Sequence, residues 1–282
     1  APDELGPGNA AQVVGYKLGM LTGGGLLLWV SEHTGFAGLF WIMAALVAAV
    51  WTVALLMKEP PMASERASPV TLGGVVRSAV DSLWARTGLW MLVIVATYKT
   101  GESMTDVMFK PFLVDAGFSA GSIGLWVGTW GQGFSIAGSL IGGWLALRFS
   151  ISRALLVVAS LRVLPLVGIW VLSLVPFGAR EVVAVTCAEH LFGGALTTVM
   201  FALMMRSVDR RVGATHFTAL AALEVMGKSP GAWLSGVLAD QLGYGAVFGL
   251  GALLSLAYVG LVAWAGPDRL RPPPDAPPLD AG

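Results

Sequence analysis

Long apolar stretches divide this 282-residue chain, and they constrain its fold more than any other feature. Each stretch has about twenty residues or more, the length that an α-helix needs to cross the ~30 Å hydrocarbon core of a bilayer. Strands of a membrane barrel would be about half as long and would alternate apolar with polar residues. The sequence therefore predicts an all-α polytopic membrane protein with eight transmembrane helices, at 10–30, 36–57, 89–112, 123–147, 154–175, 182–205, 217–239 and 246–265.

The composition excludes several other classes of protein. Only 12% of the residues are charged, against roughly 25% in an ordinary soluble domain, so too few polar groups remain to cover a water-facing surface. The formal net charge of +0 and the single cysteine indicate neither a nucleic-acid surface nor an internal disulfide. The chain has no phosphate-binding glycine loop and no His/Cys metal spacing, so we expect no cofactor and no metal.

Lysine and arginine are concentrated in alternate connecting segments. Four lie in 58–87, two in the turn at 148–153, three in 206–211 and two in the tail. Because such residues mark the cytoplasmic side of a membrane, both ends of this chain are expected to be cytoplasmic. The proline-containing segment 58–87 separates two helices in 1–57 from six helices in 88–265, and the proline-rich tail 266–282 is expected to be disordered.

The six helices of 88–265 show an internal repeat. Residues 138–148 resemble residues 231–240 at an offset of 93, and the same offset places the third helix on the sixth and the fifth on the eighth. Secondary transporters are built from such repeats and hold their substrate at the repeat interface. A chance alignment of glycine-rich helices is the alternative.

Charged residues inside the third apolar stretch form one stripe. Lys99, Glu102, Asp106 and Lys110 are spaced i, i+3, i+7 and i+11, which places them on one helix face where the acids could pair with the bases. Each charge costs ~2.5 kcal/mol or more at bilayer depth, so the stripe must face the bundle interior or water. We interpret it as part of a substrate and proton pathway, with Glu102 or Asp106 as the titrating acid. Alternatively, Asp106 and Lys110 form an interfacial pair.

Two further helices carry charged pairs. Glu189 and His190 are adjacent in the sixth apolar stretch, and a carboxylate beside a histidine could relay protons. Alternatively, each of the two satisfies a separate neighbour. Glu224 and Lys228 are spaced i, i+4, which suits either a structural ion pair or a pathway pair.

Two cations and two tryptophans complete the candidates. Lys17 and Arg162 stand alone in their apolar stretches, and Lys17 could bind an anionic group of the substrate. Trp126 and Trp130 are spaced i, i+4 and could line the cavity and stack on a sugar ring. Lipid contact or helix packing is the alternative for both tryptophans.

Short motifs are spread across most of the chain, among them Tyr98 to Glu102 and residues 15–21. These two motifs resemble the seventh and the fifth helix, respectively, of the AmpG-type muropeptide permeases of the major facilitator superfamily. Siderophore uptake permeases and acetyl-CoA transporters are related branches. The other matching residues are Phe112, Leu113, Gly117, Phe118, Gly142, Gly143, Arg148, Ser150, Arg153 to Leu156, Glu189, Gly193, Gly194, Ala214, Thr215 and Phe217.

The resemblance implies a twelve-helix fold of two six-helix halves. The eight helices would correspond to helices five to twelve, which implies a sequence truncated at its N-terminus, with 1–57 as the end of the N-terminal bundle. Gly143, Arg148 and Arg153 would form the conformational-switch turn between helices eight and nine. Leu147 stands before Arg148 where most facilitators have an aspartate, and AmpG-like members share that departure.

The resemblance also implies a function, the proton-driven import of cell-wall muropeptides across the bacterial inner membrane. In that reading Lys99 and Lys17 hold carboxylates of the cargo, and Glu102 and Glu189 are candidates for protonation. The expected partners are a small solute, protons and the lipid bilayer, without nucleic acid, and the protein is expected to be monomeric and not an enzyme.

Three other functions stay open at this point. The same fold could carry another bulky solute such as a siderophore. A membrane-embedded acyltransferase could use His190 and Glu189, and would return a chemically changed product. A non-transporting fragment is the third, because four helices would be absent.

Overall fold

The described part of the chain is built from helices. A computed structural model describes residues 15, 16, 18–57, 88–208 and 213–269, and it contains no strand within them. The expectation of an all-α chain is therefore confirmed for these residues. The elements are η2 (Leu21–Leu26), α2 (Leu27–Leu56), α4 (Gly88–Thr97), α5 (Thr100–Asp115), α6 (Ala120–Ile123), η4 (Gly124–Trp130), α7 (Gly131–Arg148), α8 (Ile151–Leu172), α9 (Ala179–Ser207), α10 (Gly213–Leu242) and α11 (Tyr244–Arg269).

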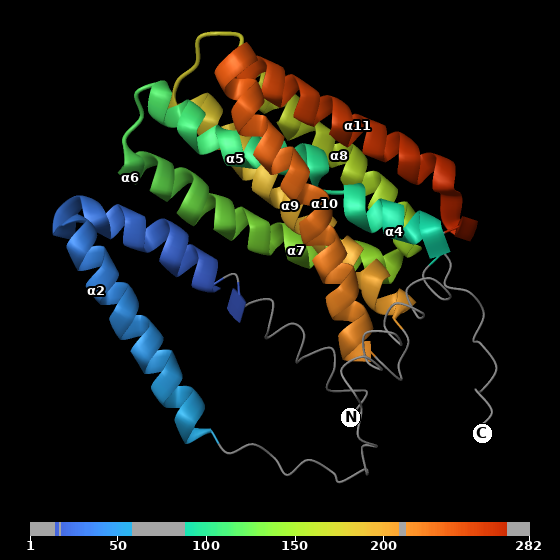
Figure 1. The fold of residues 1–282 in the computed structure, drawn as a ribbon, viewed down its shortest axis with the longest axis horizontal. Helices are drawn as coiled ribbons and strands as arrows, with labels where there is room; N and C mark the ends of the chain where they lie inside the picture. Colours follow the sequence, from blue (N-terminus) through green and yellow to red (C-terminus); the bar gives the residue numbers. More distant parts are fainter. Residues whose placement is uncertain (1–14, 17, 58–87, 209–212, 270–282) are drawn as a thin grey trace.

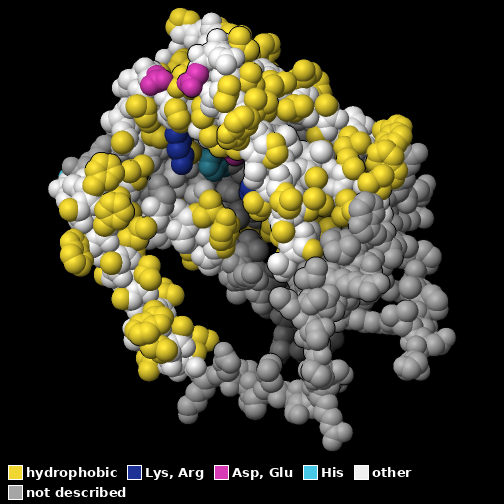
Figure 2. Space-filling view, in the orientation of Figure 1, with side chains coloured by type: hydrophobic (Ala, Val, Ile, Leu, Met, Phe, Trp, Pro, Cys, Tyr) yellow, Lys and Arg dark blue, Asp and Glu magenta, His cyan; other side chains and the backbone are white. Residues whose placement is uncertain are grey.

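Several helices are suited to a bilayer. By length and composition, four of the described helices can cross a membrane: His33–Leu56, Ile151–Leu172, Ala179–Ser207 and Tyr244–Gly266. Apolar side chains cover much of the face in Figure 2, as expected for a surface in contact with lipid. The predicted total of eight transmembrane helices stays a prediction, and segment 58–87 and most of tail 266–282 lie outside the described residues.

Some of the predicted helices differ from a plain α-helix. The stretch predicted at 89–112 breaks at Tyr98 and Lys99, where Lys99 has φ −108° and ψ 1°. Beyond the break, the hydroxyls of Thr100 and Ser103 donate to backbone carbonyls of α10, which ties the start of α5 to that helix. The stretch predicted at 123–147 includes the π-helix η4, a rare geometry that is frequent at functional sites.

Helix packing supports the internal repeat. The first three-helix unit consists of α4 with α5, then η4 with α7, then α8, and the second consists of α9, α10 and α11. The first helix of each unit packs on the middle helix of the other, α9 on α7, and α4 and α5 on α10. The third helix of each unit packs on the first helix of the other, α8 on α9 and α11 on α5, and the two third helices pack on each other (Figure 1). Glycine permits the closest approaches, since a Cβ at Gly138 would lie 1.9 Å from the carbonyl oxygen of Leu191, and one at Gly227 would lie 1.9 Å from that of Ala96.

Two apolar clusters enclose a polar level inside this bundle. The first cluster includes residues 154–159 of α8 and 195–204 of α9, and the second includes Ile169 of α8 and Val182 of α9. Arg162 and Glu189 therefore lie between the two clusters along their helices. Glu102 has the same position between Tyr98 and Met104 of the third stretch. The sequence thus places its buried charges part-way along the bundle, with apolar packing on either side.

Candidate functional site

Arg162 of α8 is the central residue of the polar level, the layer of Glu102, Arg162 and Glu189 between the two apolar clusters. Its side chain is only 2% exposed. The Nε atom donates to Oε2 of Glu102 on α5 at 3.3 Å. The two terminal nitrogens donate to the backbone carbonyl and to Oε1 of Glu189 on α9. A guanidinium offers several donors in a rigid fork, so one buried cation can join three helices.

His190 extends this cluster along α9. Its Nδ1 lies 2.5 Å from Oε2 of Glu189 and 3.1 Å from the carbonyl oxygen of Thr186. Both neighbours accept hydrogen bonds, so Nδ1 carries a proton. Both carboxylate oxygens of Glu189 are therefore engaged, one by Arg162 and the other by His190. A Cβ at Gly131 would lie 2.8 Å from the ring Nε2, so the histidine ring packs directly on the start of α7.

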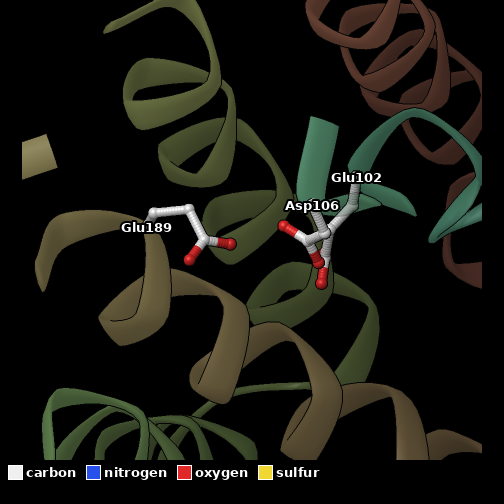
Figure 3. Close-up of side chains that lie close together, drawn as sticks. All are labelled: Glu102, Asp106 and Glu189. Atoms are coloured by element: carbon white, nitrogen blue, oxygen red, sulfur yellow. The ribbon is translucent and has the colours of Figure 1, made fainter. Parts of the chain in front are cut away.

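Three carboxyl groups converge beside the guanidinium. One oxygen from each of Glu102, Asp106 and Glu189 lies within 4.8 Å of the others. Figure 3 shows Glu102 and Asp106 leaving α5 together, with Glu189 pointing toward them from α9. Among the described residues, Asp106 has no salt bridge, whereas the other two bind Arg162. Three such oxygens could also hold a hard metal cation, but the guanidinium already occupies two of the three groups.

A second ion-pair cluster lies at the break between α4 and α5. Lys99 Nζ is 3.4 Å from Oε1 of Glu224 on α10, and Lys228 Nζ is 3.9 Å from the same oxygen. The pairing expected along the stripe is therefore wrong for Glu102, which pairs with Arg162 across the bundle. The break provides the reason, because Lys99 precedes α5 and lacks the regular helical geometry that would align it with Glu102.

A cavity of about 540 Å³ adjoins both ion-pair clusters, the one around Arg162 and the one around Glu224. Its volume lies within the range of small-molecule sites. Its charged and imidazole lining comes from Lys99, Glu102, Asp106, Lys110, Glu189 and His190. In Figure 2 dark blue and cyan side-chain atoms are visible in a hollow below the magenta acidic side chains near the top. The cavity thus brings together acids, bases and a histidine from α5, from Lys99 just before it, and from α9.

The remaining predicted residues occupy varied places. Tyr98 is buried in the first apolar cluster, with Lys99 Nζ 5.5 Å from its ring centroid. Trp126 packs edge to face on Phe118, and Trp130 is exposed. Neither tryptophan lines the described cavity. Trp126 packs against the second apolar cluster instead, and Trp130 faces the outside of the bundle.

The predicted switch turn lies away from the cavity. Gly143 is half-buried in α7, Arg148 is the exposed last residue of that helix, and Arg153 is exposed in the first turn of α8. None of the three lines the described cavity. Lys17 lies outside the described residues, although its neighbour Tyr16 contributes to the lining.

The sequence analysis missed two parts of the site. It left Arg162 without a partner, although an isolated charge in an apolar helix signals a partner on another helix. It also missed the polar lining from Gln132, Ser135 and Thr197. Single uncharged polar residues are common in membrane helices, so no sequence signal distinguishes these three.

Known proteins resemble the chain over most of its length, although no protein-family model matches it. It is 34% identical over 229 residues to the anhydromuropeptide permease of Escherichia coli K12, covering 80% of this chain and 46% of that protein. It is 25% identical over 279 residues to an uncharacterized protein of Haemophilus influenzae, covering 94% and 65%. A Rickettsia conorii protein with "transporter AmpG 4" in its name is 20% identical over 255 residues, covering 88% and 61%.

These matches extend over only part of each relative. The chain spans about half the length of the E. coli permease, and its long apolar helices are those of a multi-pass membrane protein. The matches cover 80%, 94% and 88% of this chain. In sequence, the chain is therefore similar to permeases and transporters of the AmpG type.

Proposed function

We propose that the protein imports cell-wall muropeptides across the bacterial inner membrane in symport with protons. The observation that carries the proposal is the cluster around the buried Arg162, whose partners Glu102 and Glu189, together with His190, line the cavity. Buried ionisable groups at membrane depth are expensive and usually mark substrate or proton pathways. The E. coli relative is named as an anhydromuropeptide permease, which supports the choice of cargo.

Asp106 is the group that we assign to proton uptake. The cluster holds three carboxyl groups against one guanidinium, and among the described residues Glu102 and Glu189 form its salt bridges. A proton on Asp106 would relieve repulsion among the carboxylates without breaking either salt bridge. Asp106 also lines the cavity, so a proton can reach it without opening the packed core.

The proposed architecture is that of a major facilitator. Residues 1–57 supply the end of one bundle, 58–87 link the bundles on the cytoplasmic side, and 88–265 form the second bundle, with both chain ends cytoplasmic. The two bundles would rock around the cavity, with the turn at Gly143, Arg148 and Arg153 as the switch. The packing exchange between α5, α10, α9 and α7 supports the repeat on which such rocking depends. The protein would act as a monomer, without enzymatic activity.

The test is uptake of radiolabelled anhydro-muramyl peptide into right-side-out membrane vesicles, with and without an inward proton gradient. We expect gradient-dependent accumulation, and we expect Asp106→Asn to abolish the dependence on the gradient. Asp240→Asn is the matched control, since Asp240 is exposed on α10 and does not line the cavity. The E. coli permease and any longer product of the same gene would be assayed in parallel.

Each other outcome points to a defined alternative. Uptake by the longer product alone would mark this chain as a non-transporting portion. Accumulation of a siderophore instead of the muropeptide would change the cargo, and a chemically altered product would favour an acyltransferase. Absence of uptake in vesicles with confirmed insertion of each protein contradicts the proposal.

A further inference from the structure

One buried carboxylate, Glu224, is shared by two lysines. Both ammonium groups approach the same oxygen, Oε1 of Glu224. The Nζ atom of Lys99, just before α5, lies 3.4 Å from it, and the Nζ atom of Lys228, one turn further along α10, lies 3.9 Å from it. The cluster therefore carries one cation more than it has anions. The glutamate side chain is 7% exposed, and the lysine side chains are 19% and 36% exposed. Only Lys99 of the three lines the cavity.

We propose that Glu224 is an internal carboxylate that occupies Lys99 until a carboxylate of the ligand replaces it. This inference rests on the proposed function, because a muropeptide supplies the incoming carboxylate. In the exchange, Lys99 turns from Glu224 to the ligand, and Glu224 stays paired with Lys228. Lys228 is thus a positioning residue that acts through Glu224 and does not touch the ligand.

Charge balance explains why two lysines are needed. A buried carboxylate that loses its only cation costs several kcal/mol, so a lone Lys99–Glu224 pair would resist exchange. The second lysine removes this cost, because Glu224 has a cation both before and after the ligand binds. Before binding the cluster has two cations and one anion, and after binding it has two of each. The ligand carboxylate therefore gains Lys99 as a partner, and Glu224 is not left without a cation.

The start of α5 favours the same anion. The helix begins at Thr100, directly after Lys99, and no side chain caps its first turn. A helix N-terminus carries a partial positive charge from its unpaired N–H groups. An anion held by Lys99 at the cavity wall would also lie near this end of α5. Transporters use interrupted helices in the same physical way, with the N-terminal end of a half-helix directed at an anionic group.

Ligand binding to the full chain in lipid nanodiscs tests the exchange. The two probes are an anhydro-muramyl peptide with free carboxylates and the same compound with its carboxylates converted to methyl esters. The wild type should bind the free carboxylate form more tightly. Glu224→Gln should tighten that binding by about threefold or more, and Lys228→Gln should weaken it about tenfold, the equivalent of ~1.4 kcal/mol. The double variant should lose the defect of Lys228→Gln, because no carboxylate is left that requires a cation.

Two controls separate exchange from loss of structure. The ester should bind each variant within about twofold of the wild type, since it brings no charge to Lys99. Asp240→Asn, an exposed acid on the same helix, should change neither affinity. The suppression in the double variant is the feature that a merely structural role of Lys228 would not produce.

The possible failures are distinguishable. If the wild type binds neither probe, the proposed function is contradicted together with the inference. If it binds both probes equally, the proposed function stands and the anion subsite does not, whatever the variants do. If Glu224→Gln weakens both probes alike, or the double variant is as defective as Lys228→Gln, Glu224 is a structural partner and the exchange is refuted.

Discussion

Replacement of Arg162 by methionine tests the central salt bridges most directly. The substitution keeps much of the side-chain volume and removes the buried cation that contacts Glu102 and Glu189. Those carboxylates are only 11% and 9% exposed, so water compensates them poorly. Removing one partner of a buried ion pair costs about 3–5 kcal/mol. We expect the free energy of unfolding to fall by about that amount, a large share of the ~5–15 kcal/mol that stabilises an ordinary domain.

The assay is equilibrium unfolding in mixed detergent micelles, followed by helical circular dichroism. Arg162→Lys keeps the charge and loses part of the hydrogen-bond fork, so its loss should be smaller, about 1.5–3 kcal/mol. Adding Glu102→Gln and Glu189→Gln to the methionine variant should restore about half of the stability or more, because no buried charge is then left unpaired. Arg180→Met, at an exposed position in the first turn of α9, is the matched control.

Two results would refute this reasoning. One is a methionine variant at Arg162 that unfolds within about 0.5 kcal/mol of the Arg180 control. The other is a triple variant that is less stable than the single one. Either result would mean that the carboxylates of Glu102 and Glu189 do not depend on the guanidinium, and the cluster would lose its role as the organising feature of the polar level.

Two further substitutions probe the helix contacts around the site. Gly138→Ala should destabilise the protein by about 1–3 kcal/mol, because the added Cβ would lie 1.9 Å from the carbonyl oxygen of Leu191. Gly236→Ala is the control and should not destabilise the protein, since its Cβ would meet no atom within 4 Å. Thermal unfolding in detergent compares the two variants. Tyr244→Phe removes the 2.5 Å hydrogen bond from its hydroxyl to Asp115 at an exposed site, and the same assay should show a loss of only about 0.5 kcal/mol; a loss of several kcal/mol would contradict that view of the contact.

The helices could largely be predicted from the sequence because their cause is local. An apolar run of about twenty residues must satisfy its backbone hydrogen bonds internally in lipid, so length and composition alone define a helix. The stretch predicted at 154–175 accordingly corresponds to α8 at Ile151–Leu172, with ends that differ by three residues. The break at Lys99 has a tertiary cause, since the hydroxyls of Thr100 and Ser103 donate to carbonyls of α10 more than a hundred residues away. No local pattern encodes that contact.

The ion pairs were harder to predict because sequence spacing reports only neighbours on one helix. Lys99 and Glu102 have the spacing of a pair, yet the structure separates them and gives each a partner from another helix. The sequence feature that did indicate an interhelical contact is the absence of any acidic residue on α8, the helix that carries Arg162. A guanidinium stays charged in a protein, so a buried one requires an acidic partner from another helix. A buried arginine without a partner on its own helix therefore predicts an interhelical cluster more reliably than a well-spaced pair does, and here two acids on α5 and α9 meet that demand.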